Sequence, residues 1–145
     1  MITDLDAEMR KRSIDGIMVL GDTTLANPNL TYVVGGNLAR GGMYFKRMGK
    51  APLLVVSNLD IETARKLGRV RKIQTYTQWG LEGLMKKYRG RDEATARLIA
   101  IILKHEGFRK VGIFGRNDLA SGIQLVEKLR KLGLKVVGGK SPTVI

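Results

Sequence analysis

The sequence predicts an α/β fold in one domain: a mixed, mostly parallel sheet of about six strands, with one antiparallel hairpin and helices on both faces. Three observations predict it. Short apolar runs alternate with amphipathic stretches along the chain. The second half reads helix–strand–helix–strand, which is typical of parallel strands joined by right-handed crossovers. The apolar runs 43–45 and 53–56 are too close in sequence for a crossover, so they predict the hairpin.

The first part of the chain predicts a helix, a buried strand and a short helix. A charged amphipathic segment precedes Gly16–Leu20, which is apolar on both faces and is therefore expected in the centre of the sheet. Residues 27–29, Asn-Pro-Asn, favour a helix start, because Asn caps helices and proline fits the first helical position. Gly35 and Gly36 are expected to end this helix, since glycine adopts the left-handed conformation freely.

The later elements follow from the same two signals, apolar periodicity and glycine stops. Ser57 to Asp60 offer caps for the first helix after the hairpin, and most other acids also stand at predicted caps or first turns. The predicted helices after the hairpin are 61–67, 81–88, one capped by Asp92 that ends at Gly107, and a last one capped by Asn117 or Asp118. The predicted strands after the hairpin are 73–76, 111–114 and 134–137.

Composition limits the classes of protein. The chain has 145 residues, of which 43% are hydrophobic, and this suits one domain, residues 1–145, with its own core. The sequence has no cysteine, which excludes disulfides and thiolate chemistry. No apolar stretch is long enough to cross a bilayer, and the N-terminus lacks a signal-peptide pattern. We therefore expect a cytoplasmic protein without a membrane partner.

The net charge of +13 favours acidic partners. The first thirty residues hold five acids and three bases, so the excess lies in the rest of the chain. The basic runs 65–72 and 86–91 each lie at a predicted helix C-terminus and in the connection after it, where the helix dipole alone accounts for cations. A piece of a larger protein can also be basic because its remainder is acidic. A free-standing basic α/β module that binds nucleic acid or another acidic partner is the alternative function.

The residues themselves suggest no catalytic centre. His105, the only histidine, is placed in the last turn of a predicted helix, where a cation is favoured. Residues 112–115, Gly-Ile-Phe-Gly, match a phosphate-binding loop only in part and are expected to form a strand-to-helix turn. No catalytic residue, metal ligand set or cofactor site is therefore predicted in this chain.

One motif resembles a known family. Asn29-x-x-Tyr32-x-x-Gly35 follows a hydrophobic strand, and a charged helix precedes that strand. This arrangement resembles the N-terminal domain of the creatinase, prolidase and aminopeptidase P family, which are Xaa-Pro peptidases and pita-bread metallohydrolases. A helix cap with a buried tyrosine is the alternative interpretation of the motif. The resemblance extends to the order of elements over nearly the whole chain, and it implies the family's ribonuclease H-like N-terminal fold.

The resemblance implies that the catalytic pita-bread domain is absent from this chain and would follow residues 141–145. That domain would hold two divalent metal ions (Mn, Co or Zn) on two aspartates, a histidine and two glutamates. The parent would be a metalloprotease, an Xaa-Pro aminopeptidase or dipeptidase that acts on proline-containing peptides. The present part would be inactive alone. It would contact its missing catalytic domain, shape access to the cleft and help to form a homodimer.

The resemblance also assigns roles to individual residues. Asn29, Tyr32 and Gly35, with Gly36, would set the geometry of the loop that follows. Arg40, in the loop 37–42, would face the cleft and pair with a substrate carboxylate. A solvated loop arginine is the alternative. Residues 33, 34 and 36 depart from the family's usual pattern, so the resemblance does not extend to substrate preference.

Overall fold

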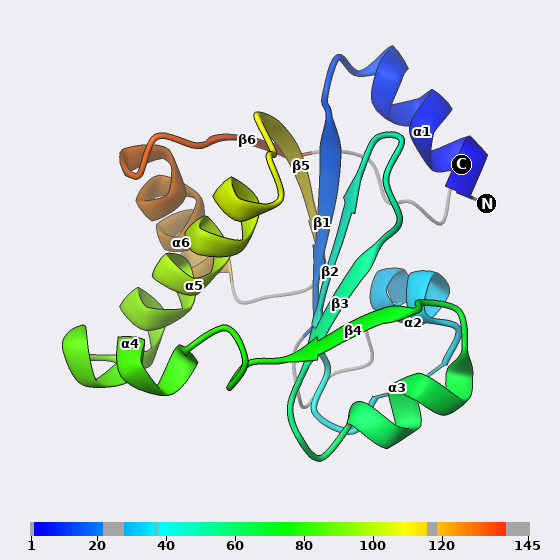
Figure 1. Ribbon diagram of the computed structural model, residues 1–145. Coiled ribbons are helices and arrows are strands. Elements are labelled where there is room, and N and C mark those ends of the chain that lie inside the picture. Colours follow the sequence, from blue (N-terminus) through cyan, green and yellow to red (C-terminus); the bar gives the residue numbers. More distant parts are fainter. Residues whose placement is uncertain (1, 22–27, 37, 116–118, 139–145) are drawn as a thin grey trace.

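The computed structural model describes residues 2–21, 28–36, 38–115 and 119–138, and Figure 1 shows how its elements are arranged. In chain order the elements are α1 (Ile2–Lys11), β1 (Gly16–Leu20), α2 (Pro28–Val34), β2 (Met43–Arg47), β3 (Leu53–Val56), α3 (Ile61–Leu67), β4 (Lys72–Thr75), α4 (Leu81–Lys87), α5 (Arg91–His105), β5 (Lys110–Gly115), α6 (Leu119–Lys131) and β6 (Lys135–Gly138).

Six strands form one sheet in the order β4-β3-β2-β1-β5-β6. β1 lies inside the sheet, antiparallel to β2 and parallel to β5. β3 and β4 pair in parallel, as do β5 and β6, whereas β2 and β3 form the antiparallel hairpin. The predicted fold class is confirmed. In the described sheet, β2 is the strand that runs against its neighbours on both sides.

Helices cover both faces of this sheet, α1 to α3 on one side and α4 to α6 on the other (Figure 1). Alternation along β1 explains how one strand serves two cores. Ile17 and Val19 pack in the cluster with α1, α2 and α3, and Met18 packs with α5 and α6 on the other face. β1 is buried over most of its length, as its unbroken apolar run predicts.

The long helix α5 supplies much of the second core. Leu98, Ile99, Ile102 and Leu103 are fully buried against the sheet and the neighbouring helices. Burying a side chain of this size contributes about 1.5–3 kcal/mol relative to leaving it in water. α5 therefore covers much of this face of the sheet. Across the described residues, no helix is both long and apolar enough to span a membrane.

Three local predictions are wrong. α5 begins at Arg91 with Gly90 at its N-cap, so Asp92 is already inside the helix. Asp60 stands at the N-cap of α3, but its side chain makes no capping hydrogen bond. Residues 112–115 lie within β5 and form no turn, because the parallel pairing with β1 continues to Gly115. The predicted caps of α6, Asn117 and Asp118, and the segment 141–145 lie outside the described residues.

Candidate functional site

The loop 38–42 lies at one end of the sheet, between α2 and the start of β2. Its last residue is fixed to the sheet: the Gly21 N–H donates to the Gly42 carbonyl at 2.9 Å. A Cβ at position 42 would lie 3.0 Å from the Val55 carbonyl oxygen, so only glycine lets the loop approach β3 so closely. The end of the loop therefore packs directly against the strands.

Asp60 holds the exposed part of this loop. Its side chain is buried, with 2% of the residue exposed, and its two oxygens accept hydrogen bonds from successive backbone N–H groups. Oδ1 accepts from Ala39 at 3.0 Å, and Oδ2 accepts from Arg40 at 2.8 Å. Hydrogen bonds to a carboxylate are stronger than those between neutral groups. The backbone at Arg40 is thus fixed by a residue twenty positions later in the chain.

Sequence reasoning missed this role of Asp60. An Asp directly before a helix is the usual signature of a cap, and no local signal distinguishes a capping side chain from one that turns to another loop. The N-cap interaction of α3 is made by the backbone alone, through the Asp60 carbonyl and the Ala64 N–H at 2.9 Å. The carboxylate is therefore free of the helix and available to the loop.

Arg40 projects from this fixed backbone into solvent. The residue is exposed, and its guanidinium makes no hydrogen bond or ion pair with the described residues. Its five N–H donors are therefore open to an anionic group that comes from outside the described chain. Arg40 thus combines a fixed backbone with an exposed guanidinium.

The other predicted site residues lie on α2 and directly after it. Tyr32 is 37% exposed, so it is not the buried tyrosine of the alternative interpretation. Its carbonyl accepts a hydrogen bond from Arg69 Nη1 at 2.7 Å. Asn29 lies in α2, and its side chain is outside the described set. No hydrogen bond or ion pair between described residues joins Arg40 to Tyr32.

The two glycines allow α2 to meet the end of α3. Gly35 has a φ of +92°, and its N–H donates to the Thr31 carbonyl at 2.9 Å. A Cβ at position 36 would lie 2.6 Å from Leu67 Cδ2. The glycine pair therefore lets the end of α2 pack closely against the end of α3.

The described residues contain no group of three or more His, Asp or Glu side chains that could hold a metal ion. The ring of His105 meets Trp79 edge-on, with 5.3 Å between centroids, and its Nδ1 lies 3.3 Å from Glu106 Oε2. Burial raises the pKa of Tyr44 well above its usual range and that of Tyr76 to about 12, so both phenols stay neutral. His105 therefore has structural partners, and these described groups form no nucleophile–base pair with one another.

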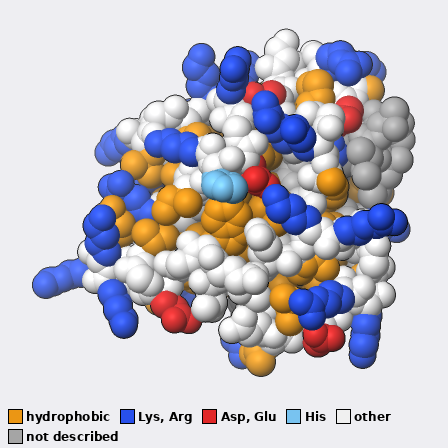
Figure 2. All heavy atoms as spheres, viewed as in Figure 1, with side chains coloured by type: hydrophobic (Ala, Val, Ile, Leu, Met, Phe, Trp, Pro, Cys, Tyr) orange, Lys and Arg blue, Asp and Glu red, His pale blue; other side chains and the backbone are white. Residues whose placement is uncertain are grey.

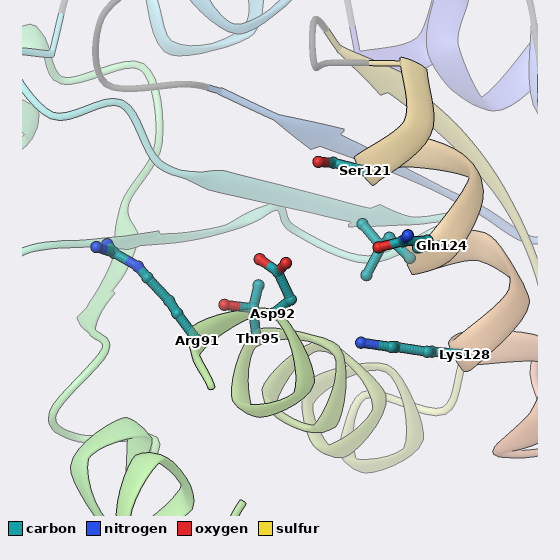
Figure 3. Close-up of a pocket in the computed structure, with 7 residues that line it drawn as sticks. Arg91, Asp92, Thr95, Ser121, Gln124 and Lys128 are labelled. Carbon is teal, nitrogen blue, oxygen red and sulfur yellow. The ribbon is translucent and has the colours of Figure 1, made fainter. Parts of the chain in front are cut away.

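A small cavity of about 120 Å³ lies between α5 and α6. Figure 3 shows Asp92 and Thr95 on α5, with Ser121, Gln124 and Lys128 of α6 opposite and the Lys128 side chain directed toward α5. Its lining mixes charges of both signs with hydroxyl and amide groups, without a nucleophile–base pair. It does not resemble a catalytic pocket.

The basic runs lie where the sequence predicts, at helix ends. Arg65 pairs with Glu62 at 2.8 Å, and Lys87 and Arg97 lie over the Tyr88 ring, 5.4 and 4.6 Å from its centroid. Figure 2 shows Lys and Arg side chains spread over the visible face with few acids among them. The Tyr88 ring is thus already contacted by cations, which leaves less of it for stacking on a nucleic-acid base.

No protein-family model and no curated protein matches this sequence. Solved structures do match. The chain is similar to the prolidase from Pyrococcus horikoshii OT3, with a TM-score of 0.59 and 20% identity over 94% of this chain and 31% of that one. It is also similar to the Xaa-Pro dipeptidase from Bacillus anthracis, with a TM-score of 0.65 and 15% identity over 96% of this chain and 32% of that one.

A third structure decides which part of those enzymes is matched. It is described as the creatinase/prolidase N-terminal domain of an X-Pro dipeptidase from Streptococcus pyogenes, and it matches with a TM-score of 0.58 and 10% identity over 99% of this chain and 95% of that one. The fold is that of the creatinase/prolidase N-terminal domain. This chain spans about a third of the two longer enzymes and nearly all of the isolated creatinase/prolidase N-terminal domain. The expected fold is thereby confirmed.

Proposed function

We propose that this chain serves as the non-catalytic N-terminal domain of a metal-dependent Xaa-Pro aminopeptidase or dipeptidase. The observation that carries the proposal is the creatinase/prolidase N-terminal fold over nearly the whole chain. The prolidase and the dipeptidase that share this fold are about three times as long, which leaves room for a separate catalytic domain. In this proposal residues 1–145 are the first domain, and two divalent ions (Mn, Co or Zn) are bound by the second.

The role of the domain is to present the loop 38–42 to the catalytic cleft. Asp60 fixes the backbone, and the exposed Arg40 guanidinium has no anionic partner in the described chain. A carboxylate accepts two parallel hydrogen bonds from a guanidinium, so the end of a short proline-containing peptide is a suitable partner. Asn29, Tyr32, Gly35 and Gly36 support this by setting the path of the chain into the loop.

The domain's own partners are its catalytic domain and, in a homodimer, a second copy of the protein in the cytoplasm. The most direct test is to read the coding sequence beyond Ile145. The proposal expects an in-frame extension that contains two aspartates, a histidine and two glutamates as metal ligands. A stop codon directly after Ile145 would contradict it.

Light scattering of the full-length protein tests the homodimer. The proposal expects the mass of a dimer, and the mass of a monomer would exclude it.

Arg40 is tested in that full-length protein. The change Arg40→Ala should raise KM for an Xaa-Pro dipeptide by about ten- to a hundredfold, because a charged hydrogen bond contributes about 1.5–3 kcal/mol. Arg71→Ala is the matched control, since Arg71 is also exposed and has no partner among the described residues. An equal change in both variants would remove the role of Arg40. Binding of nucleic acid with a steep dependence on salt would instead support the alternative function.

A further inference from the structure

A cavity of about 420 Å³ opens where the β2–β3 hairpin, the start of β4 and the end of α5 meet. It lies at the opposite end of β2 from the loop 38–42, so it is separate from the proposed cleft-facing surface. Its lining includes the nearly buried Phe45 and Phe108, and its polar residues are Arg47, Lys50, Lys72, His105 and Glu106. A volume of this size is typical of small-molecule sites.

The rim carries more positive than negative charge. Three cations from three different elements surround one carboxylate. Glu106 Oε1 accepts from Lys72 Nζ at 2.8 Å, and Oε2 lies 3.3 Å from His105 Nδ1. Burial opposes the ionisation of Glu106, but the hydrogen bonds from Lys72 and His105 outweigh it and lower its pKa. One negative charge is therefore present, and it cannot balance all three cations.

Two of the cations have a structural role. Lys72 is held by Glu106, as described above. Arg47 Nη1 donates to the Glu106 carbonyl at 3.4 Å and lies beside Gly107, where a Cβ would come within 2.9 Å of the same nitrogen. A guanidinium in this position offsets the negative end of α5. Arg47 uses one of its donors there, and the others remain for a ligand.

Lys50 has no such role. Its backbone N–H closes the hairpin by donating to the Arg47 carbonyl at 3.0 Å. Its side chain is exposed and makes no hydrogen bond or ion pair with any described residue. The fold therefore does not need the Lys50 ammonium, although the hairpin holds it at the rim of a cationic cavity.

We propose that this cavity binds the phosphate group of a small phosphate monoester. A dianion matches a rim whose formal charges are three positive and one negative, and phosphate oxygens accept the hydrogen bonds that Arg47 and Lys50 can donate. The cavity is larger than a phosphate ion, so it leaves room for the organic part of the ester. This inference does not depend on the proposed peptidase role.

The test is a calorimetric titration of the full 145-residue chain with phenyl phosphate and, separately, with inorganic phosphate. We expect saturable binding of phenyl phosphate and weaker binding of inorganic phosphate. The change Lys50→Ala should weaken phenyl phosphate binding about tenfold, as expected for the loss of one hydrogen bond from a charged donor. Lys131→Ala is the matched control, because Lys131 is an exposed lysine on α6 away from the cavity. It should change the affinity less than twofold.

Three results would overturn the proposal. The first is the absence of saturable binding of either ligand. The second is an equal loss of affinity in Lys50→Ala and Lys131→Ala, which would assign binding to the overall charge of the protein. The third is equal affinity for the two ligands, which would show that the cavity does not hold the organic part of the ester. Thermal unfolding of both variants controls for the fold, and both should match the unmodified chain because neither side chain has a folded-state partner among the described residues.

Discussion

Asp60 is the residue on which the position of the Arg40 loop depends most. The change Asp60→Ala removes both oxygens that accept from Ala39 and Arg40, at 3.0 and 2.8 Å. It leaves the start of α3 intact, because the first hydrogen bond of that helix runs from the Ala64 N–H to the Asp60 carbonyl and involves backbone atoms only. The perturbation is therefore confined to the link between the loop and the helix.

The size of the effect follows from the two bonds and from the exposure of their donors. Each hydrogen bond to a charged group contributes about 1.5–3 kcal/mol. Residues 39 and 40 are exposed, so water replaces the carboxylate at both amides and reduces the loss. We expect Asp60→Ala to lower the free energy of unfolding by about 2–3 kcal/mol in total. For a domain of this size that corresponds to a fall in Tm of about 6–9 °C.

Urea denaturation measures the stability, and hydrogen exchange at the Ala39 and Arg40 amides measures the loop. Both amides should exchange faster in Asp60→Ala. The matched control is Asp92→Ala, because Asp92 also stands near a helix start but has no partner among the described residues. This variant should lower the free energy of unfolding by about 0.5 kcal/mol, through the loss of a favourable charge at the helix dipole. Equal stability losses in the two variants, with unchanged exchange at residues 39 and 40, would show that the Asp60 carboxylate does not hold the loop.

Three further predictions concern the pH dependence of stability, the glycine turn and a buried ion pair. Hydrogen bonds lower the pKa of Glu106 below its ordinary value of 4.5, so its stabilisation is present above that pH and is lost as the pH falls through the folded-state pKa. In urea unfolding, the Glu106→Gln variant should therefore lose less stability on acidification than the unmodified chain. Parallel curves of unfolding free energy against pH would contradict this. Gly35→Ala should lower the free energy of unfolding by about 1–2 kcal/mol, because the φ of Gly35 is +92°. The control Gly83→Ala, in an open position of α4, should be neutral or stabilising. Similar unfolding midpoints for the two variants would contradict the requirement for glycine at position 35. Asp6→Ala should cost about 3–5 kcal/mol, because it leaves the fully buried Lys46 ammonium without its carboxylate at 2.9 Å. Adding Lys46→Met should recover part of that loss, and a strictly additive double mutant would show that the pair is not coupled.

Local patterns were enough to predict most of the secondary structure. β1 and β3 occupy the predicted residues, and α3 ends at Gly68, whose φ of +70° only glycine adopts without strain. The hairpin followed from the short distance between two apolar runs. These signals succeed because the burial of a strand and the end of a helix are decided within a few residues.

Contacts between distant segments could not be predicted in this way. Asp15 accepts hydrogen bonds from the N–H groups of Arg109 and Lys110, at 2.9 and 3.0 Å, and so ties the start of β1 to the start of β5. Lys46 is completely buried in β2 because Asp6 of α1 reaches it. In the sequence these acids resemble caps and the lysine resembles a surface residue. Their partners lie about 40 to 95 positions away, beyond any local pattern.

The candidate site shows the same division. An exposed arginine in a loop after two glycines is a local feature, and the structure places Arg40 there. The hydrogen bonds from the loop backbone to Asp60 are tertiary contacts, and they depend on the position of α3 beside the loop in the folded structure. The sequence therefore indicated which residue faces outward but not what holds it.

The proposed non-catalytic role implies that the chain alone should not hydrolyse Xaa-Pro dipeptides. The most direct measurement is the release of proline from Xaa-Pro dipeptides by the purified 145-residue chain, with Mn²⁺, Co²⁺ or Zn²⁺ added and with a metal-free control. We expect the same background rate in every sample. A rate that rises with added metal and saturates with dipeptide would contradict it.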